Sequence, residues 1–430
     1  MENIVIIIVD ALRTKNMSLF GYKRETDTNM KKLSQESILF KNHISVSNST
    51  FPSLTSLFTG KYPTNHGVIH QFPYMEKEEL EKLKKNKFWF PSYLKKKGYY
   101  NIGIDWIGWW FKKDFDYYGE KAPSMYDEIK NNRIARLVLL NLPNFIYKFG
   151  KKITRKENTS LFSPAHKTAE LTISKIKEAK KPFFLFVHFE DTHFPFPTIK
   201  IETKIKDKKS YQEILENIKE KSQKEYVKKR LEDISIYSIP EIIKKYDTAI
   251  KYVDEQIGKI MDFLKREGLW EKTIFIVLAD HGESLGEHKI YFSHAGIYDE
   301  TVHVPLIMKF PGFEKKEIDG MVQNIDIVPT ILDYFGDIEN KKKEFDGKSL
   351  LGMIKGGKEI RDKAYSIEGL AGDVKSVRTK DRKLIIAKEG RCKLCGAIHH
   401  NGIEEYNLKE DDGENKNIYS GESKLKKFLE

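Results

Sequence analysis

The chain has 430 residues, of which 40% are hydrophobic and 12% are aromatic. This composition excludes an intrinsically disordered protein, and the length is too great for one small core, so we expect one large α/β domain and a smaller one. The formal net charge of +12 indicates an affinity for polyanions or for an anionic substrate. No nucleic-acid-binding motif accompanies this charge, so nucleic acid is the less favoured partner.

Three apolar runs predict strands of a parallel sheet. They span residues 3–9, 182–189 and 273–278, and the first is rich in β-branched side chains. Strands that are buried on both faces have this composition, and they occur mainly in parallel sheets. In open α/β sheets, ligands bind beyond the carboxyl ends of the strands, so polar residues at those ends are candidate ligands.

Asp or His follows each of these predicted strands. Asp10 comes after the first strand, His193 after the second, and Asp280 and His281 after the third. One strand that ends in Asp is weak evidence. Three such strands, together with a hydroxyl residue at the start of a helix, form a specific constellation.

The hydroxyl residue is Thr50. Pro52 favours a helix start and Gly60 favours its end, so a short helix is predicted between them. The free N–H groups and partial positive charge at a helix start suit a tetrahedral oxyanion. Thr50 therefore stands where a nucleophile that attacks phosphate or sulfate would stand. Its alternative role is that of a helix cap, which Thr often plays.

The segments between these motifs are less regular. Insertions are predicted at about 76–150 and 195–240, and the second is expected to cover the active site and set substrate choice. The aromatic stretch 106–111 is typical of core packing or of a pocket for a sugar or lipid group. The apolar stretch 134–147 is too short and too polar to span a bilayer, which leaves a covered helix or a peripheral membrane contact. Helical spacing of apolar residues predicts a long helix over 242–264.

A domain boundary is predicted near residue 340. Residues 1–340 would form a catalytic domain, and residues 341–430 a small C-terminal subdomain built on an antiparallel sheet. The N-terminus has no basic region before its apolar run, so no targeting segment is expected and a cytoplasmic location is predicted.

Two cysteines stand in the predicted subdomain. Cys392 and Cys395 are separated by two residues, and His399 and His400 follow closely. This spacing resembles half of a zinc site. A structural zinc, a redox pair and a reduced hairpin without a ligand are the three interpretations.

Taken in chain order, the motifs resemble the sulfatase branch of the alkaline phosphatase superfamily. The resemblance implies an α/β fold: an alkaline phosphatase-like three-layer sandwich with a mostly parallel central sheet and a smaller C-terminal α+β subdomain. It also implies a metal-dependent hydrolase that acts on ester bonds. The segments that carry the resemblance are 9–13, 52–68, 193–196, 280–288, 298–307 and 404–417.

Four positions depart from the family pattern. Thr50 replaces the Cys or Ser that becomes formylglycine in sulfatases, and Leu54 replaces the Arg four residues later, so formylglycine is not expected. Ala11 replaces a second Asp, and His281 replaces an Asn. One carboxylate fewer and one imidazole more favour Mn²⁺ or Zn²⁺ over Ca²⁺, which stays possible. The combination is that of relatives that act on phosphorus.

The resemblance implies a role for each of these site residues. One divalent cation would be held by Asp10, Thr50, Asp280 and His281. Thr50, His193 and His294 would act in catalysis, and Arg13, Lys61 and His288 would bind the substrate. A second metal would need a further set, for which Asp191, His193 and His294 are candidates.

The preferred function is hydrolysis or transfer of a phosphate or phosphonate ester through a phospho-Thr50 intermediate. An anionic phosphoester or sulfate ester would be the substrate. The first alternative is a sulfuric ester hydrolase that works without formylglycine. The second is a catalytically silent relative that binds anions or membranes.

Overall fold

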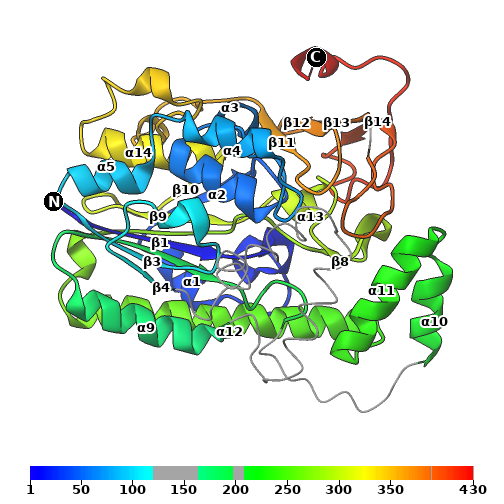
Figure 1. The fold of residues 1–430 in the computed structure, drawn as a ribbon, viewed down its shortest axis with the longest axis horizontal. Coiled ribbons are helices and arrows are strands. Elements are labelled where there is room, and N and C mark those ends of the chain that lie inside the picture. The colour runs from blue at the N-terminus through cyan, green and yellow to red at the C-terminus, as the bar shows by residue number, and fades with distance from the viewer. Residues whose placement is uncertain (120–162, 197–207, 389, 430) are drawn as a thin grey trace.

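The computed structural model describes residues 1–119, 163–196, 208–388 and 390–429. Within these residues the central sheet has eight strands in the order β10-β2-β9-β6-β1-β5-β3-β4 (Figure 1). Most neighbouring strands are parallel, and β9 runs antiparallel to both β2 and β6. The strands are β1 (Asn3–Val9), β2 (Ile38–His43), β3 (Tyr100–Ile104), β4 (Tyr117–Gly119), β5 (Phe183–Phe189), β6 (Thr273–Leu278), β9 (Leu306–Lys309) and β10 (Lys316–Val322).

The three predicted strands form the centre of this sheet. β1 pairs in parallel with β5 on one side and with β6 on the other, and every residue of the three strands is buried. Side chains alternate between the two faces of a strand. Ile4, Ile6 and Ile8 therefore enter the core on one face, while Val5, Ile7 and Val9 enter the core on the other.

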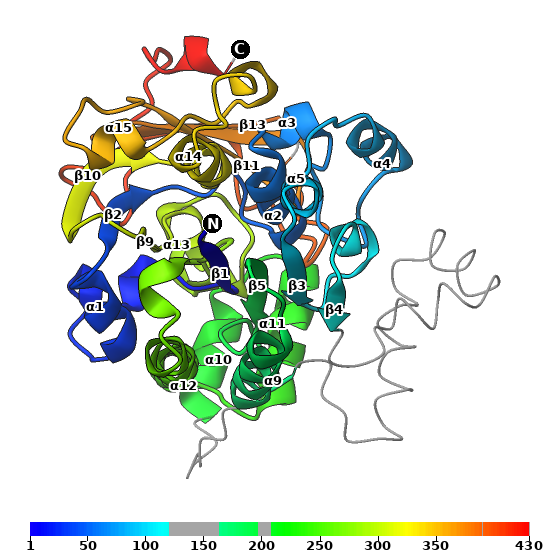
Figure 2. The same cartoon turned by 90° about the vertical axis from the view of Figure 1, so that its left-hand side faces the viewer.

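Helices cover both faces of the sheet (Figure 2). One face is packed by α1 (Thr28–Ser34), α9 (Ala165–Glu178) and α12 (Ile239–Arg266), and the other by α2 (Thr50–Thr59), α5 (Phe90–Lys96) and α14 (Ile327–Tyr334). The three-layer sandwich expected from the sequence is confirmed. The long helix predicted over 242–264 is confirmed as α12.

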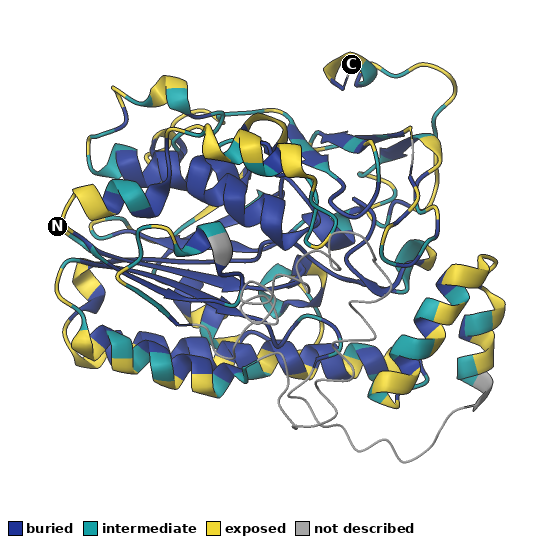
Figure 3. Ribbon diagram, viewed as in Figure 1, coloured by how far each residue is buried: buried dark blue, intermediate teal, exposed yellow. Residues whose placement is uncertain are grey.

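The remaining helices are short or lie at the periphery. Figure 1 shows α10 and α11 at one end of the molecule, beyond the carboxyl ends of the central strands. Both carry many exposed residues, whereas α2 is buried along its whole length (Figure 3). These helices are α3 (Pro63–His66), α4 (Lys77–Lys84), α10 (Lys208–Glu216), α11 (Lys221–Ile234), α13 (Asp299–Val302) and α15 (Leu351–Ile354).

A second, smaller sheet follows in the C-terminal part of the chain. It is antiparallel, in the order β11-β12-β13-β14, as expected for a small C-terminal subdomain. Leu351, Met353 and Ile354 of α15 pack into the core of the main sheet, so the boundary at residue 340 stays a prediction. The strands are β11 (Ala364–Ile367), β12 (Val374–Arg378), β13 (Arg382–Ala387) and β14 (Gly402–Asn407), and a separate pair is formed by β7 (Ser284–Leu285) and β8 (Tyr291–Ser293).

Among the described residues, no helix is both long enough and apolar enough to cross a bilayer. The stretch 134–147, for which a peripheral membrane contact was one interpretation, lies outside the described residues.

Candidate active site

The carboxyl ends of β1, β5 and β6 bring together a buried group of three polar side chains. Asp10 directly follows β1, Asp280 follows β6, and His188 lies one residue before the end of β5. One ligand atom from each of the three lies within 4.8 Å of the other two. In the described part of the chain, Asp10 Oδ1, Asp280 Oδ2 and His188 Nε2 are buried and accept or donate no hydrogen bond. Because buried polar groups without partners are costly, this donor set fits a divalent cation.

Local backbone geometry aims the two carboxylates at each other. The turn after β1 places Ala11 in the left-handed region, with φ of 56°, which is uncommon for a residue other than Gly, Asn or Asp. The Ala11 N–H donates to Asp280 Oδ1 at 3.3 Å, and the His281 N–H donates to the same oxygen at 2.9 Å. These bonds fix one oxygen of Asp280 and leave Oδ2 for a ligand.

His188 was not identified from the sequence. Asp105 directly follows β3, and its Oδ1 lies 2.8 Å from His188 Nδ1. The other ring nitrogen, His188 Nε2, lies 3.6 Å from Asp10 Oδ2. A carboxylate that holds one ring nitrogen of a His so that the other faces a metal is a recurrent arrangement in metal sites. The signal that was available is that His188 is the one polar residue in an otherwise apolar strand.

Thr50 is the first residue of α2. Ser49 occupies the cap position, so the helix begins two residues before Pro52, and the expectation that Pro52 starts it is corrected. The Thr50 hydroxyl oxygen lies 3.2 Å from His281 Nε2. Ser53, one turn further along α2, donates its hydroxyl to the carbonyl oxygen of Asp280 at 2.7 Å. The helix is therefore tied to the loop that carries Asp280, which places Thr50 at the carboxylate pair.

His281 faces both carboxylates through Nε2. Its Nδ1 lies 2.8 Å from the carbonyl oxygen of Gly282, and because a carbonyl can only accept, Nδ1 carries the proton. The Nε2 atom lies 3.4 Å from Asp10 Oδ1 and 3.5 Å from Asp280 Oδ2. The structure thus brings together all four residues that the sequence proposed as metal ligands.

His193 and His294 lie beside this group. The ring of His294 stacks on that of His281 with centroids 4.3 Å apart, and the ring of His193 lies 5.5 Å from His294 and 6.2 Å from His281. His294 Nδ1 donates to the carbonyl oxygen of Asn48 at 2.6 Å. His193 Nδ1 donates to the carbonyl oxygen of Phe194 at 2.7 Å.

The ionisable groups of the site perturb one another. Burial raises the pKa of Asp10, but three neighbouring histidines, above all His193, outweigh burial and hold that pKa well below its ordinary value. Burial and the charge of Asp10 raise the pKa of Asp280. Burial lowers the pKa of His188, but its two carboxylate partners leave that pKa well above its ordinary value. Burial and the nearby His281 lower the pKa of His294, which favours its neutral form.

Glu283 is a further buried carboxyl group close to the site. In the described part of the chain neither of its oxygens has a hydrogen-bond partner. Burial raises the pKa of Glu283 to about 7, and the attraction of His193 and Arg230 offsets part of that shift. The sequence drew attention to Glu283 only as part of a motif, because burial of this kind leaves no local pattern.

Three residues expected to bind the substrate have other surroundings. The Arg13 guanidinium is engaged by the Asn16 side chain, the Glu283 carbonyl oxygen and the Glu287 carboxylate at 2.6–3.0 Å. Lys61 follows the far end of α2, and since a helix rises about 1.5 Å per residue it lies roughly 15 Å from Thr50. Substrate binding by Lys61 stays a prediction.

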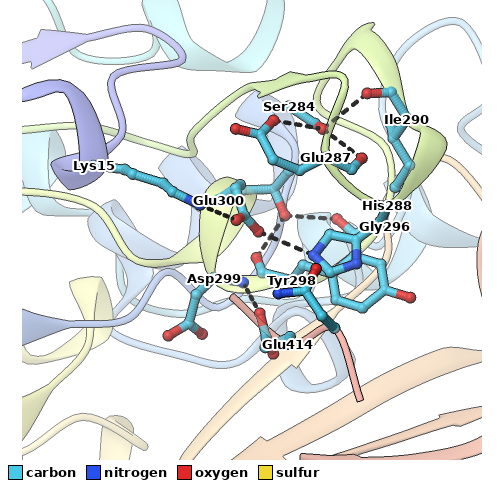
Figure 4. A network of polar contacts seen from close by, with 12 residues as sticks. Lys15, Ser284, Glu287, His288, Ile290, Gly296, Tyr298, Asp299, Glu300 and Glu414 are labelled. Carbon is cyan, nitrogen blue, oxygen red and sulfur yellow. Dashed lines mark hydrogen bonds and ion pairs between the residues drawn. The ribbon is translucent and has the colours of Figure 1, made fainter. Parts of the chain in front are cut away.

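His288 belongs to a different group. Its ring stacks on Tyr298 with centroids 3.6 Å apart, and its Nε2 lies 3.4 Å from Glu300 Oε2 (Figure 4). His288, Glu300 and Glu414 form a second group of potential ligands, whose ligand atoms lie within 4.8 Å of one another. His288 is therefore placed with this second group instead of with Thr50.

The second metal considered from the sequence finds no matching group. Within the described residues, Asp191, His193 and His294 are not among the sets whose ligand atoms all lie within 4.8 Å. Asp191 Oδ1 accepts the N–H of Ala165 at the start of α9, at 3.3 Å. The geometry supports one cation at the carboxyl edge of the sheet.

Comparison with known proteins places the chain in a family. Residues 2–338 match the family model described as Sulfatase, and residues 286–429 match one described as N-sulphoglucosamine sulphohydrolase, C-terminal. A relative from Escherichia coli, described as an uncharacterized sulfatase, is 25% identical over 372 residues, which cover 82% of this chain and 71% of that protein. A multifunctional alkaline phosphatase superfamily protein of Trinickia caryophylli is 32% identical over 116 residues, or 26% of this chain and 22% of that protein.

Solved structures show the same fold. A 2-O glycosaminoglycan sulfatase aligns with a TM-score of 0.67 and 19% identity, covering 100% of this chain and 89% of that one. A phosphonate monoester hydrolase of Agrobacterium radiobacter aligns with a TM-score of 0.65 and 17% identity, covering 100% and 93%. Fold and site together define an ester hydrolase with an alkaline phosphatase-like catalytic sheet. The chain belongs to the sulfatase family.

Proposed function

We propose that this protein hydrolyses a phosphate or phosphonate ester, or transfers its phosphoryl group, through a covalent intermediate on Thr50. One observation carries the proposal. The Thr50 hydroxyl lies 3.2 Å from His281 Nε2, beside three buried ligand atoms that have no partner in the described part of the chain. A hydroxyl in that position can be activated as a nucleophile, and a cation held by those ligand atoms would neutralise charge on an anionic ester.

The residues present fit one divalent cation. Asp10, His188 and Asp280 would hold it, with His281 and Thr50 beside them. When bound, such a cation lowers the pKa of a coordinated hydroxyl and neutralises charge on the ester oxygens. The mixture of carboxylates and imidazoles favours Mn²⁺ or Zn²⁺ over Ca²⁺.

The reaction would proceed in two steps, in which side chains of the protein form and break the bonds to phosphorus and move the protons. The Thr50 oxygen forms a bond to phosphorus as the bond to the leaving alcohol breaks, and the Thr50 proton passes to a neighbouring base. The leaving alcohol needs a proton, and His193 can donate one from Nε2 when that nitrogen is protonated as well as Nδ1, whose N–H is held by a carbonyl. In the second step water, or an acceptor alcohol, attacks phosphorus, the bond between phosphorus and the Thr50 oxygen breaks, and Thr50 recovers a proton from the base as the attacking group gives one up.

Two features favour phosphorus over sulfur. A formylglycine cannot be made from Thr50, and the two cysteines of the chain stand at positions 392 and 395. Leu54, at the position of the family's Arg, is buried in the hydrophobic core on one face of the sheet. Sulfate ester hydrolysis is the second candidate, because the Escherichia coli relative and one of the two solved structures bear the name sulfatase.

The test compares Thr50→Ala with Thr50→Ser in the metal-loaded protein. Each variant is assayed against aryl phosphate, aryl phosphodiester, aryl phosphonate and aryl sulfate esters. We expect Thr50→Ala to lose at least about 10³-fold in kcat/KM, as removal of a nucleophile does, while Thr50→Ser keeps measurable turnover. Intact-mass analysis of acid-quenched protein should detect the added phosphoryl group in the wild type and not in Thr50→Ala.

The outcomes separate the alternatives. Turnover of the sulfate ester alone would favour a sulfatase that works without formylglycine. Full activity in Thr50→Ala would exclude the covalent step on this residue. Loss of activity in Thr50→Ala with no trapped adduct would leave the ester chemistry in place and assign Thr50 to binding.

A further inference from the structure

The loop between β13 and β14 folds into a tight hairpin, which we call the cysteine hairpin and define as residues 391–399. The Cys392 N–H donates to the carbonyl oxygen of Ala397 at 2.7 Å, and the Gly396 N–H donates to that of Cys392 at 2.8 Å. Gly396 has φ of 74°, a conformation that Gly adopts most readily. The backbone therefore turns sharply after the second cysteine and brings both thiols to the same side.

Two sulfur atoms and one imidazole nitrogen lie close together inside this hairpin. Cys395 Sγ lies 3.1 Å from His399 Nε2, and the ligand atoms of Cys392, Cys395 and His399 all lie within 4.8 Å of one another. The two cysteines are 1% and 6% exposed and form no disulfide. The Leu394 N–H points at Cys392 Sγ at 3.4 Å. A backbone donor aimed at sulfur stabilises the thiolate, which is the form that binds metals.

From this geometry we propose that Cys392, Cys395 and His399 bind a zinc ion, separate from the cation of the active site. Two thiolates and one imidazole are ligands that zinc prefers, and its tetrahedral shell leaves one position. Cys395 and His399 line a narrow crevice together with Tyr226 and Ser293. The Tyr226 hydroxyl is buried and has no hydrogen-bond partner among the described residues.

The cysteine hairpin packs on a part of the chain that is distant in sequence. Gly396 packs so closely on Ser222 of α11 that a Cβ at residue 396 would lie 2.8 Å from the Ser222 hydroxyl oxygen. The ring of Tyr226, also on α11, packs against the same apolar cluster as the two cysteines. Zinc would thus stiffen the hairpin on which α11, a helix of the insertion at 195–240, packs.

The hairpin is also connected to the active site. The Lys393 N–H donates to the carbonyl oxygen of Leu370 at 2.6 Å, and Glu368, two residues earlier, accepts from the Asn48 side chain at 2.5 Å. The Asn48 carbonyl oxygen holds His294, and Thr50 follows two residues later. Loss of the zinc should therefore loosen α11 first and disturb substrate binding second.

The test uses the full chain, purified under reducing conditions and dialysed against a weak chelator. Elemental analysis should find one equivalent of zinc that Asp10→Asn retains and that Cys392→Ser and Cys395→Ser lose. After cobalt replaces the zinc, the wild type should show a thiolate-to-cobalt charge-transfer band in the near ultraviolet. Ile398→Ala is the matched control, because Ile398 lies in the same hairpin and is 47% exposed; it should keep both the zinc and the band.

A second measurement keeps the proposal testable if the Cys variants do not fold. In the wild-type protein, both thiols should react slowly with a thiol reagent and should react faster, by at least tenfold, once a strong chelator has removed the zinc. The same rate with and without chelator would overturn the proposal. So would a cobalt protein without the thiolate band, or thiols already joined in a disulfide. None of these results depends on ester hydrolysis, so the proposed function can fail while this proposal stands.

Discussion

Two buried groups in this protein have the same composition, one His and two acids, and yet different surroundings. Asp10, His188 and Asp280 lie at the carboxyl edge of the main sheet, and His288, Glu300 and Glu414 lie near the C-terminal sheet. In both groups the ligand atoms lie within 4.8 Å of one another. Composition and spacing therefore do not separate a metal site from a structural network.

The difference lies in the charges supplied by the chain. In the second group the Lys15 ammonium lies 2.7 Å from Glu300, and the buried Lys383 ammonium lies 2.9 Å from Glu414 (Figure 4 shows Lys15 beside Glu300). Each carboxylate there already has a cation. Asp10 and Asp280 have instead imidazoles as their near basic partners. Both groups keep carboxylate oxygens without a hydrogen bond among the described residues, so the contrast rests on the ammonium groups alone. The internal ammonium groups therefore favour an external cation at the first group over the second.

The largest expected effect comes from removing one charge of the first group. Asp10→Asn keeps the shape of the side chain but weakens the ligand, so the bound cation should be lost and kcat/KM should fall at least about 10³-fold. Elemental analysis and steady-state assays of the same sample measure both. Retention of metal and activity in Asp10→Asn would mean that the first group is structural as well.

A large effect on stability is expected at Asp299, which shares the Lys383 ammonium with Glu414 of the second group. Asp299 lies 2.9 Å from both Arg378 and the buried Lys383. Asp299→Asn leaves two buried cations short of a partner, and breaking a buried ion pair from one side costs about 3–5 kcal/mol. Urea denaturation at neutral pH measures the loss. A cost below about 1 kcal/mol would show that these cations are stabilised by other groups.

The ion pairs of Asp299 also predict that the stability of the protein depends on pH. Burial raises the pKa of Asp299, but Arg378 and Lys383 outweigh burial and hold it well below its ordinary value. Asp299 therefore contributes its full stability above an unfolded pKa of about 4 and loses it as pH falls towards the folded pKa. The free energy of unfolding should fall more steeply in the wild type than in Asp299→Asn between pH 5 and pH 3. Glu414, whose pKa burial raises to about 7, acts mainly above this window.

A smaller effect is expected from the group that orients His188. Asp105→Asn weakens the bond that fixes Nδ1, and loss of such an orienting carboxylate typically lowers metal affinity by about 10–100-fold. Metal titration followed by activity measures the change. Tyr118→Phe is the matched control, because the Tyr118 hydroxyl donates to the other oxygen of Asp105 at 2.5 Å and does not touch His188. Equal effects in both variants would assign Asp105 a general structural role.

The sequence predicted the parts of the site that stand at strand ends. Asp10 and Asp280 follow apolar runs, and ligands gather at the carboxyl ends of parallel strands, so their meeting could be expected before any coordinates. His188 lies inside a strand, where an isolated polar residue has no periodic signal. Its partner Asp105 follows a different strand, and their pairing depends on the order of the strands in the sheet.

Nearness in sequence misjudges which side chains lie close to Thr50. Lys61 follows the same helix that Thr50 begins, but the length of the helix separates them. His288 follows His281 by seven residues, and the loop between them carries His288 into the second group. Such errors arise because a helix or loop converts a short sequence interval into a distance that only the fold determines.

The smallest effect should come from His288 itself. If the lysines already balance the second group, His288→Gln leaves the metal content unchanged and alters kcat/KM by less than about threefold, while loss of stacking on Tyr298 costs about 1 kcal/mol. His288→Phe restores a stacking ring without a ligand nitrogen, so it should recover most of that stability. Elemental analysis decides the comparison: loss of one metal equivalent in both variants would make the second group a metal site, and internal lysines would then be no guide to where this protein binds cations.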